Sequence, residues 1–190
     1  KTMAAIAVAG VGMMVMCSSS VAAAMMMGGE EKEDPIVKTP DTPSGPTLPS
    51  GQYVKLVQTS LTDVINLAEL EVFAKAGTTN LAAGKTVTSS AFHPAGPLPH
   101  LVDGVITGYN FAHTMNEVAD TEDSMLIDLG SVQEIEKIKI TNRVDCCTDR
   151  AIGMKVVILG ADGTTVIKET AAITTDAATY TFTFPGTAWV

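Results

Sequence analysis

Leu67-Ala-Glu-Leu-Glu-Val-Phe73 is a run in which glutamates alternate with apolar residues. Successive side chains of a β-strand point to opposite faces, so this period of two predicts a strand with one buried face. The same period recurs at Val54 and Leu56, at Ile138 and Ile140, at Met154, Val156 and Ile158, and at Tyr180, Phe182 and Phe184. Turn signals such as Asp162-Gly163 separate these runs. Because no stretch after residue 29 keeps a helical period for two turns, we expect an all-β fold, an antiparallel β-sandwich.

The sequence lacks the motifs that usually carry catalysis. It has no Gly-x-Ser-x-Gly elbow, no His-Glu-x-x-His metal motif and no glycine-rich phosphate loop. Glu69 and Glu71 share one face of their predicted strand, and we expect that face to be exposed rather than to line a cleft. We therefore predict a protein that is not an enzyme.

The N-terminal segment from Thr2 to Gly29 carries no charge and holds seven of the ten methionines. At about 1.5 Å per residue, a helix of this length crosses the hydrocarbon layer of a bilayer, which is about 30 Å thick. We therefore expect one transmembrane helix over residues 1–29. The residues expected in the membrane include Met3, Val15, Cys17 and Met27. A secretory signal peptide, cleaved near Val21-Ala-Ala-Ala24, is the alternative.

Residues 30–51 form a proline-rich linker between this segment and the strands. The prolines stand at positions 35, 40, 43, 46 and 49. They block helices and sheet ladders and favour an extended polyproline II spacer. Lys1 before the apolar segment and the acidic run Glu30–Asp34 after it favour the non-cytoplasmic side for the rest of the chain. The β-domain then occupies residues 52–190.

The chain is acidic, with a net charge of −9 at neutral pH. A nucleic-acid partner requires a basic surface that neutralises phosphates, and the sequence offers no basic patch. We therefore predict no nucleic-acid partner and no attraction to anionic lipid.

Asn142-Arg-Val-Asp-Cys-Cys-Thr-Asp-Arg150 places two arginines and an aspartate around a pair of adjacent cysteines. Guanidinium groups and a carboxylate fixed in one loop can hold hydroxyl groups in a defined geometry, as sugar recognition requires. The alternative is a local salt-bridge network that only shapes the loop. Adjacent α-carbons are about 3.8 Å apart, below the usual disulfide range. The residues alone therefore leave open a strained disulfide, free thiols or metal-bound thiols.

These residues resemble the signature of a known lectin family. Arg143, Asp145 and Arg150 resemble the arginine-x-aspartate-x4-arginine signature of the F-type lectins, within the wider discoidin, or coagulation factor 5/8 type C, superfamily. His113-Thr114 resembles the sugar-binding histidine motif of these lectins, although its separation from Arg143 is longer than the usual spacing. Further similar segments are Asn80–Ser90, Leu101–Gly104 and Met125–Gly130, so the likeness covers most of residues 53–190.

The resemblance implies a jelly roll of the galactose-binding-domain type that binds fucose-type glycans. It implies that His113, Arg143, Asp145 and Arg150 contact the sugar, and that Cys146 and Cys147 form a vicinal disulfide with a rigid face for the sugar ring.

Asp103 lies in the segment that resembles the calcium loop of these lectins, which implies a bound Ca²⁺ ion. Val105 stands where the family usually has asparagine, so one ligand of that loop is missing. An ordinary Asp-Gly turn is therefore the alternative.

The order of the similar segments departs from the family. Tyr53–Val57 and Asn66–Phe73 resemble the strand pair that closes a discoidin-type domain, yet they precede the segment that resembles its opening strand. We expect a permuted arrangement in which residues 53–73 fill the closing position of the same sandwich. The alternative is a fragment of a tandem array, but each motif occurs once, which favours permutation.

Other residues near these motifs have less specific expected roles. Tyr109 and Phe111 form either an apolar wall of a sugar pocket or part of the core. His93 and His100 are expected at the surface. The acidic residues expected in a solvated loop are Glu117, Asp120, Glu122 and Asp123.

We therefore predict a single-pass, membrane-anchored, non-catalytic carbohydrate-binding protein with its lectin-like domain on the non-cytoplasmic side. The alternative is a structural adaptor, because the methionine- and serine-rich anchor resembles those of structural proteins of large DNA viruses. The protein would then be a minor capsid protein of the virion, lying between an internal membrane and the capsid, with neighbouring capsid proteins as its partners.

Overall fold

The structure is a computed structural model that describes residues 47–115 and 122–184. The chain divides into two units, Lys1–Pro40 and Asp41–Val190, and every described residue lies in the second unit. The predicted transmembrane helix and most of the predicted linker lie outside the described residues and stay predictions. No helix among the described residues is long and apolar enough to cross a membrane.

Strands make up almost all the regular structure of the described residues. The strands are β1 (Ser50–Gln58), β2 (Asn66–Ala74), β3 (Thr86–Ser89), β4 (Ala112–His113), β5 (Ser124–Asn142), β6 (Met154–Leu159), β7 (Val166–Glu169) and β8 (Thr179–Thr183). Two short 3-10 helices, η1 (Leu98–Val102) and η2 (Thr148–Ala151), are the only helices in this part of the chain. Every strand pairing is antiparallel. The all-β, antiparallel prediction is confirmed.

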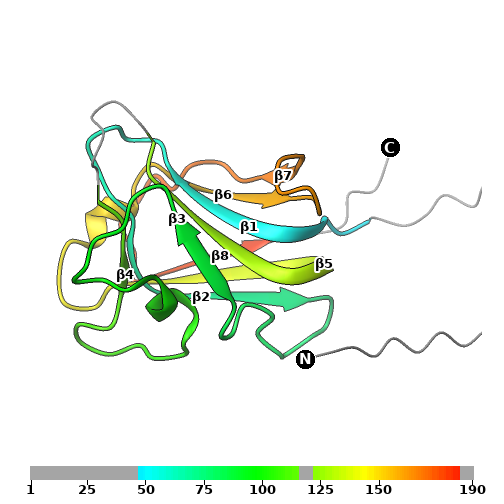
Figure 1. Ribbon diagram of the computed structural model, residues 1–190, viewed down its shortest axis with the longest axis horizontal. Coiled ribbons are helices and arrows are strands. Elements are labelled where there is room, and N and C mark those ends of the chain that lie inside the picture. Colours follow the sequence, from blue (N-terminus) through cyan, green and yellow to red (C-terminus); the bar gives the residue numbers. More distant parts are fainter. Residues whose placement is uncertain (1–46, 116–121, 185–190) are drawn as a thin grey trace, which may run out of the picture. The chain divides into compact units, whose positions relative to one another are not determined.

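The long strand β5 belongs to both layers of the fold (Figure 1). Its first half pairs with β1 and β3, and β6 and β7 extend that layer beyond β1. Its second half pairs with β2 and β8, and β4 extends that layer beyond β2. Gly130, whose φ of 87° favours glycine, lies within the part of β5 that pairs with β1. The sequence suggested separate strands at Met125–Gly130 and around Ile138, whereas one strand of 19 residues contains both.

The core lies between the two layers and takes one apolar side chain at every second strand position. Val54 and Leu56 of β1 are fully buried, as are Ile138 and Ile140 of β5, and the polar residues between them are more exposed. Met154, Val156 and Ile158 of β6, which pairs with β1 in the same layer, belong to the same core. The period of two in the sequence therefore identified the core-facing side of these strands.

Strand β2 differs from the expected half-buried strand, because Asn66 to Leu70 are all buried. The prediction that Glu69 lies on an exposed sheet face is wrong, since only 1% of Glu69 is exposed. The backbone N–H of Gly104, in the loop after η1, donates a hydrogen bond of 3.0 Å to Glu69 Oε2, so this loop lies over the carboxyl. Glu71, two residues on, stays partly exposed and pairs with Lys139 at 2.7 Å.

The N-terminal strands are built into the centre of the sandwich. Strand β1 lies between β5 and β6, and β2 lies between β4 and β5 (Figure 1). The end of β5, the strand β4 and the helix η2 consequently meet at one end of the fold, where they carry the predicted sugar-binding residues. The predicted permutation relative to the family order stays a prediction.

Candidate functional site

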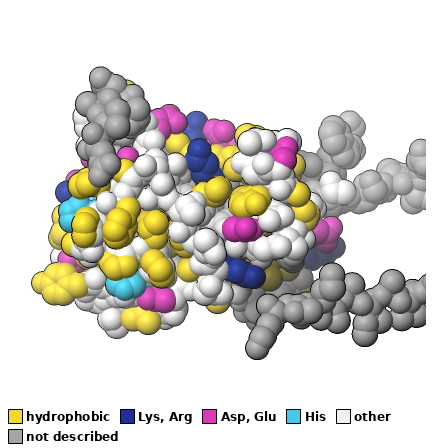
Figure 2. Space-filling view, viewed as in Figure 1, with side chains coloured by type: hydrophobic (Ala, Val, Ile, Leu, Met, Phe, Trp, Pro, Cys, Tyr) yellow, Lys and Arg dark blue, Asp and Glu magenta, His cyan; other side chains and the backbone are white. Residues whose placement is uncertain are grey.

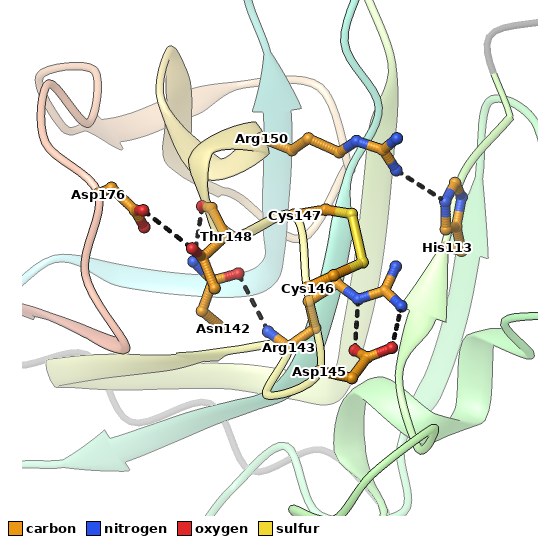
Figure 3. The surroundings of a disulfide bond; sticks show 9 residues. All are labelled: His113, Asn142, Arg143, Asp145, Cys146, Cys147, Thr148, Arg150 and Asp176. Carbon is orange, nitrogen blue, oxygen red and sulfur yellow. Dashed lines mark hydrogen bonds and ion pairs between the residues drawn. A yellow bond between two sulfur atoms is a disulfide. The ribbon is translucent and has the colours of Figure 1, made fainter.

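The loop that follows β5 begins at Asn142, whose side chain is 1% exposed. Asn142 Nδ2 donates to the carbonyl oxygens of Thr148 (2.8 Å) and Ala177 (3.1 Å), and Asn142 Oδ1 accepts from the backbone N–H of Arg143 at 3.0 Å. A further hydrogen bond, from Thr148 Oγ1 to Asp176 Oδ2 at 2.9 Å, ties the loop to the segment before β8. One amide therefore fixes both ends of a turn that contains the cysteines (Figure 3).

Arg143 and Asp145 form a two-pronged ion pair inside this turn. Arg143 Nε donates to Asp145 Oδ1 at 2.7 Å and Arg143 Nη2 to Asp145 Oδ2 at 2.6 Å. The guanidinium lies 3.8 Å above the ring centroid of Phe111, and only 8% of Arg143 is exposed. The hydrogen bonds from Arg143 lower the pKa of Asp145 below its usual range, so this carboxylate is ionised at neutral pH. A planar fork held in this way has its remaining N–H donors fixed in direction.

Cys146 and Cys147 are joined by a disulfide, as the resemblance implied. Cys147 has a φ of 59°, in the left-handed region, and η2 begins at the next residue. Cys146 is exposed and Cys147 is partly exposed. The sulfur pair therefore presents an apolar surface to solvent, and in Figure 3 the guanidinium groups of Arg143 and Arg150 lie on either side of it.

Arg150 lies on η2 and points back across the disulfide toward His113 (Figure 3). Its Nη1 is 3.5 Å from His113 Nε2, and it forms no ion pair with any described carboxylate. The backbone at Arg150 is fixed from β1, where the fully buried Gln58 donates from Nε2 to the carbonyl oxygens of Arg150 (2.7 Å) and Ile152 (3.1 Å). Sequence reasoning missed Gln58 because it lies 92 residues before Arg150.

His113 reaches the site from the short strand β4. Its backbone N–H donates to the carbonyl of Gly96 at 3.0 Å, and a Cβ added at Gly96 would lie only 2.4 Å from His113 Cβ. His113 Nδ1 bonds the carbonyl oxygen of Thr114, which can only accept, so Nδ1 carries the proton and Nε2 can accept from Arg150. Burial lowers the pKa of His113, and the charges of Arg150 and Arg143 act in the same direction. The ring is therefore neutral at neutral pH.

His93, predicted at the surface, is partly exposed and packs against His113. The two ring centroids are 4.9 Å apart, and the His93 backbone N–H donates to the carbonyl of His113 at 3.1 Å. His93 Nδ1 accepts from the backbone N–H of Ala95 at 3.1 Å, which leaves an Nε2–H as the donor of the neutral ring. No spacing rule pointed to this contact, because it depends on the path of the loop between β3 and β4.

The predicted sugar-binding residues are thus brought together at one rim of the sandwich. Arg143, Asp145 and Arg150 come from the turn after β5, His113 comes from β4, and the disulfide lies in the turn between the arginines. The rim offers fixed N–H donors, an ionised carboxylate and an apolar face within one small area. Such a set can hydrogen-bond the hydroxyl groups of a pyranose while its carbon face packs on sulfur.

Asp103, the predicted calcium ligand, lies in the exposed loop after η1. Its Oδ1 accepts from the backbone N–H of Val105 at 2.9 Å, and Asn110 Nδ2 donates to both carboxylate oxygens at 3.1 Å. The buried Glu69 lies beneath the same loop, and its Oε1 has no hydrogen-bond partner among the described residues. Burial raises the pKa of Glu69 to about 7, and the negative charge of Asp103 adds to this effect. No group of three or more acidic, histidine or cysteine side chains able to hold a metal occurs in residues 47–115 and 122–184.

The other residues singled out from the sequence have mixed positions. Phe111 is 7% exposed and supports the Arg143 guanidinium, whereas Tyr109 is 83% exposed. His100, predicted at the surface, is partly exposed, but its Nδ1 is buried without a hydrogen-bond partner among the described residues. Within the predicted acidic loop, Glu122 is exposed, but Asp123 is buried and accepts a hydrogen bond from Thr114 Oγ1, so the prediction is wrong for Asp123. Glu117 and Asp120 lie outside the described residues.

The surface has two further features. Hydrophobic and histidine side chains gather at the end of the molecule that carries the loops between β3 and β4 (Figure 2). A groove of about 570 Å³ lies on the outer face of the β1 layer, and its charged lining residues are Lys55 and Glu169. No aromatic side chain lines this groove. It therefore offers fewer sugar-binding groups than the rim does.

The comparison with protein families gave one match. Residues 100–189 match the model described as a NedA-like, galactose-binding domain of the F5/8 type C group. The match covers just under half of the chain and includes His113, all of β5 and the arginine turn. No curated protein and no solved structure gave a match. The match supports the discoidin-like part of the resemblance, and domains of this galactose-binding-like type are in general non-catalytic binding modules.

Proposed function

We propose that the rim formed by Arg143, Asp145, Cys146–Cys147, Arg150 and His113 binds carbohydrate without catalysis. The observation that carries this proposal is the fixed Arg143–Asp145 fork beside a solvent-exposed disulfide, opposite Arg150 and His113. The match of residues 100–189 to a galactose-binding domain supports the same class of ligand. We further propose a fucose-type ring as the ligand, on the resemblance of the arginine signature to that of the F-type lectins.

The roles of the residues follow from their contacts. Arg143 is held by Asp145 and Phe111, so its free donors are directed before a ligand arrives and lose little freedom on binding. Each charge-assisted hydrogen bond contributes about 1.5–3 kcal/mol, but water competes for the same groups. One rim therefore supports modest affinity, and several copies presented together would bind more tightly.

We also propose that calcium holds the loop after η1, with Asp103 and Glu69 as its acidic ligands. The support is the buried Glu69 Oε1, which lacks a hydrogen-bond partner among the described residues while Asp103 lies in the loop above. Calcium takes six to eight oxygens, so loop carbonyls and water would complete the site. The ion would neutralise two carboxylates and stabilise the loop.

The sugar proposal is tested with the full chain on a glycan array and by titration with L-fucose. We expect binding to fucose-type glycans, and we expect Arg143→Lys to weaken it by about tenfold or more, because lysine cannot form the fork. Lys139→Gln is the matched control, since Lys139 forms a partly exposed ion pair with Glu71 on β2, outside the rim. An array without any signal for the folded, unmodified protein would refute the proposal.

The proposed localisation of the protein rests on its sequence alone. We propose that the apolar segment of residues 1–29 anchors the chain in a membrane, with the sandwich on the non-cytoplasmic side. The alternative role as a virion adaptor stays a prediction, because no contact among the described residues favours it. Protease protection of the full chain in sealed vesicles distinguishes the two orientations of the anchor.

A further inference from the structure

The two arginines of the rim differ in their partners among the described residues. The charge of Arg143 is balanced by Asp145 through two hydrogen bonds of 2.7 and 2.6 Å. Arg150 has no such partner, because its one contact among the described side chains is the neutral His113 ring at 3.5 Å. A partly buried guanidinium without a carboxylate is an incomplete ion pair, and an anion supplied by a ligand would complete it.

A second histidine, His93, packs against the His113 ring that Arg150 contacts. The rings of His93 and His113 are 4.9 Å apart, and, in addition to burial, His93, Arg150 and Arg143 all act electrostatically to lower the pKa of His113. Of the acidic groups near these residues in sequence or contact, Asp145 bonds Arg143 and Asp123 accepts from Thr114 Oγ1. The exposed Asp149, next to Arg150 on η2, forms no ion pair with any described residue.

We propose that the rim prefers an acidic saccharide, in which the ring carries a carboxylate, over the corresponding neutral sugar. Arg150 would pair with the carboxylate, since a guanidinium matches its two oxygens in geometry as well as in charge. His93 would add its Nε2–H as a further donor. This inference rests on the proposed carbohydrate-binding function, because the disulfide and the Arg143 fork still hold the ring.

The preference has a predictable dependence on pH. Burial and the two arginines lower the pKa of His113, so the free protein has a neutral ring at neutral pH. A bound carboxylate stabilises the protonated ring, so the complex takes up protons that the free protein does not hold. Affinity for an acidic sugar therefore rises as the pH falls from 7.5 to 5.5, while the sugar carboxylate stays ionised above about pH 5. A neutral sugar has no carboxylate to stabilise the protonated His113 ring, so it should not bind more tightly at the lower pH.

The test compares sugars that differ at a single carbon. L-Fucose and L-galacturonate share one ring configuration and differ at C6, as D-galactose and D-galacturonate do. Each is titrated into the full chain at pH 7.5 and 5.5, and at low and high ionic strength. We expect L-galacturonate to bind about tenfold more tightly than L-fucose at low ionic strength and pH 5.5, and we expect added salt to reduce the difference.

Three variants assign the preference to its residue. Arg150→Gln should remove the preference for the acid, and Arg150→Lys should keep part of it, because the charge stays while the fork is lost. Lys168→Gln is the matched control, since Lys168 is an exposed cation on β7 outside the rim, and it should leave the preference unchanged. If Arg150→Gln fails to fold, the salt and pH dependence of the unmodified protein and the behaviour of Arg150→Lys decide the question.

The outcomes separate this inference from the function on which it rests. Binding of L-fucose with equal or weaker binding of L-galacturonate overturns the acidic preference and leaves the proposed function intact. Failure of both sugar pairs to bind overturns both. A preference for the acid that survives in Arg150→Gln, or that grows as the pH rises, overturns the assignment to this rim.

Discussion

Glu69 shows how one residue can link the loops above the sandwich to the protonation state of its interior. The carboxyl is 1% exposed and accepts a hydrogen bond through Oε2 from Gly104, while Oε1 has no partner among the described residues. Burial raises the pKa to about 7 in the folded protein from 4.5 for an ordinary glutamate. The folded state consequently binds a proton between these two pH values that the unfolded state has lost.

The sign of the pH effect on stability follows from this difference. Because the folded state holds more protons, the free energy of unfolding falls as the pH rises from 4.5 to about 7. At about 1.4 kcal/mol per pKa unit, Glu69 accounts for a loss of roughly 3 kcal/mol. We expect Glu69→Gln to remove this loss, because glutamine keeps an acceptor for Gly104 without a charge. Thermal unfolding of both proteins in a metal chelator, from pH 4.5 to 8, measures the difference.

The same thermal unfolding measurement, repeated with added calcium, tests the proposed calcium site. If the ion binds the Glu69 carboxylate, added calcium should raise the melting temperature of the unmodified protein at pH 8 and leave Glu69→Gln unchanged. Equal pH profiles for the two proteins would contradict the burial argument, and equal responses to calcium would contradict the proposed site.

At the scale of the element, the arginine turn depends on a strand that is distant in sequence. Gln58 of β1 is fully buried, holds the carbonyls of Arg150 and Ile152, and accepts from the backbone N–H of Ser60 at 3.0 Å. Gln58→Leu keeps the approximate volume but leaves these groups unpaired. We expect stability to fall by about 1–3 kcal/mol and sugar affinity to fall with it. Chemical denaturation measures the first effect, and Gln133→Leu, at a less buried position of β5, is the control.

Unlike Gln58, the disulfide within the turn should matter more for sugar binding than for stability. It closes a ring between neighbouring residues, so it restricts the unfolded chain very little. Replacing both cysteines, Cys146→Ala with Cys147→Ala, should change the melting temperature by a few degrees at most and weaken sugar binding by about tenfold, because the rigid apolar face is lost. Reduction of the unmodified protein should weaken sugar binding to the same extent. The same treatment should not change the binding of the double variant. Unchanged affinity after either treatment would show that the sulfur pair takes no part in binding.

The sequence predicted those elements and site residues whose contacts are local. Alternation identified the core-facing residues of β1 and β6, and the spacing within Asn142–Arg150 brought the arginines, the aspartate and the cysteines into one turn. It failed for Glu69, which the loop after η1 covers, and it gave no sign of the contact between His93 and His113, because the paths of both loops depend on tertiary packing. It also gave no sign of Gln58, because a buried glutamine that holds a distant backbone follows no sequence period.

At the scale of the molecule, the family match and the folding unit have different boundaries. The match begins at residue 100, yet β1 fills the position between β5 and β6, and β2 pairs with both β4 and β5. Without these strands, β5 would lose its partners on one side in each layer, and the apolar residues of β5 and β6 would face water. The loss of burial on this scale exceeds the few kcal/mol by which domains of this size are stable.

We therefore expect residues 82–190 to remain unfolded, although they contain the entire matched segment and every residue of the rim. They lack Gln58, which holds the backbone of the arginine turn. Residues 41–190 should fold with a cooperative thermal transition and bind the same sugar as the full chain, because they contain every described strand. Circular dichroism and amide NMR dispersion compare the two fragments directly. A folded, sugar-binding fragment 82–190 would show that the domain folds without β1 and β2. The arginine turn would then not need Gln58. If β1 holds the rim, both the truncation to residues 82–190 and the Gln58→Leu variant must lose sugar affinity.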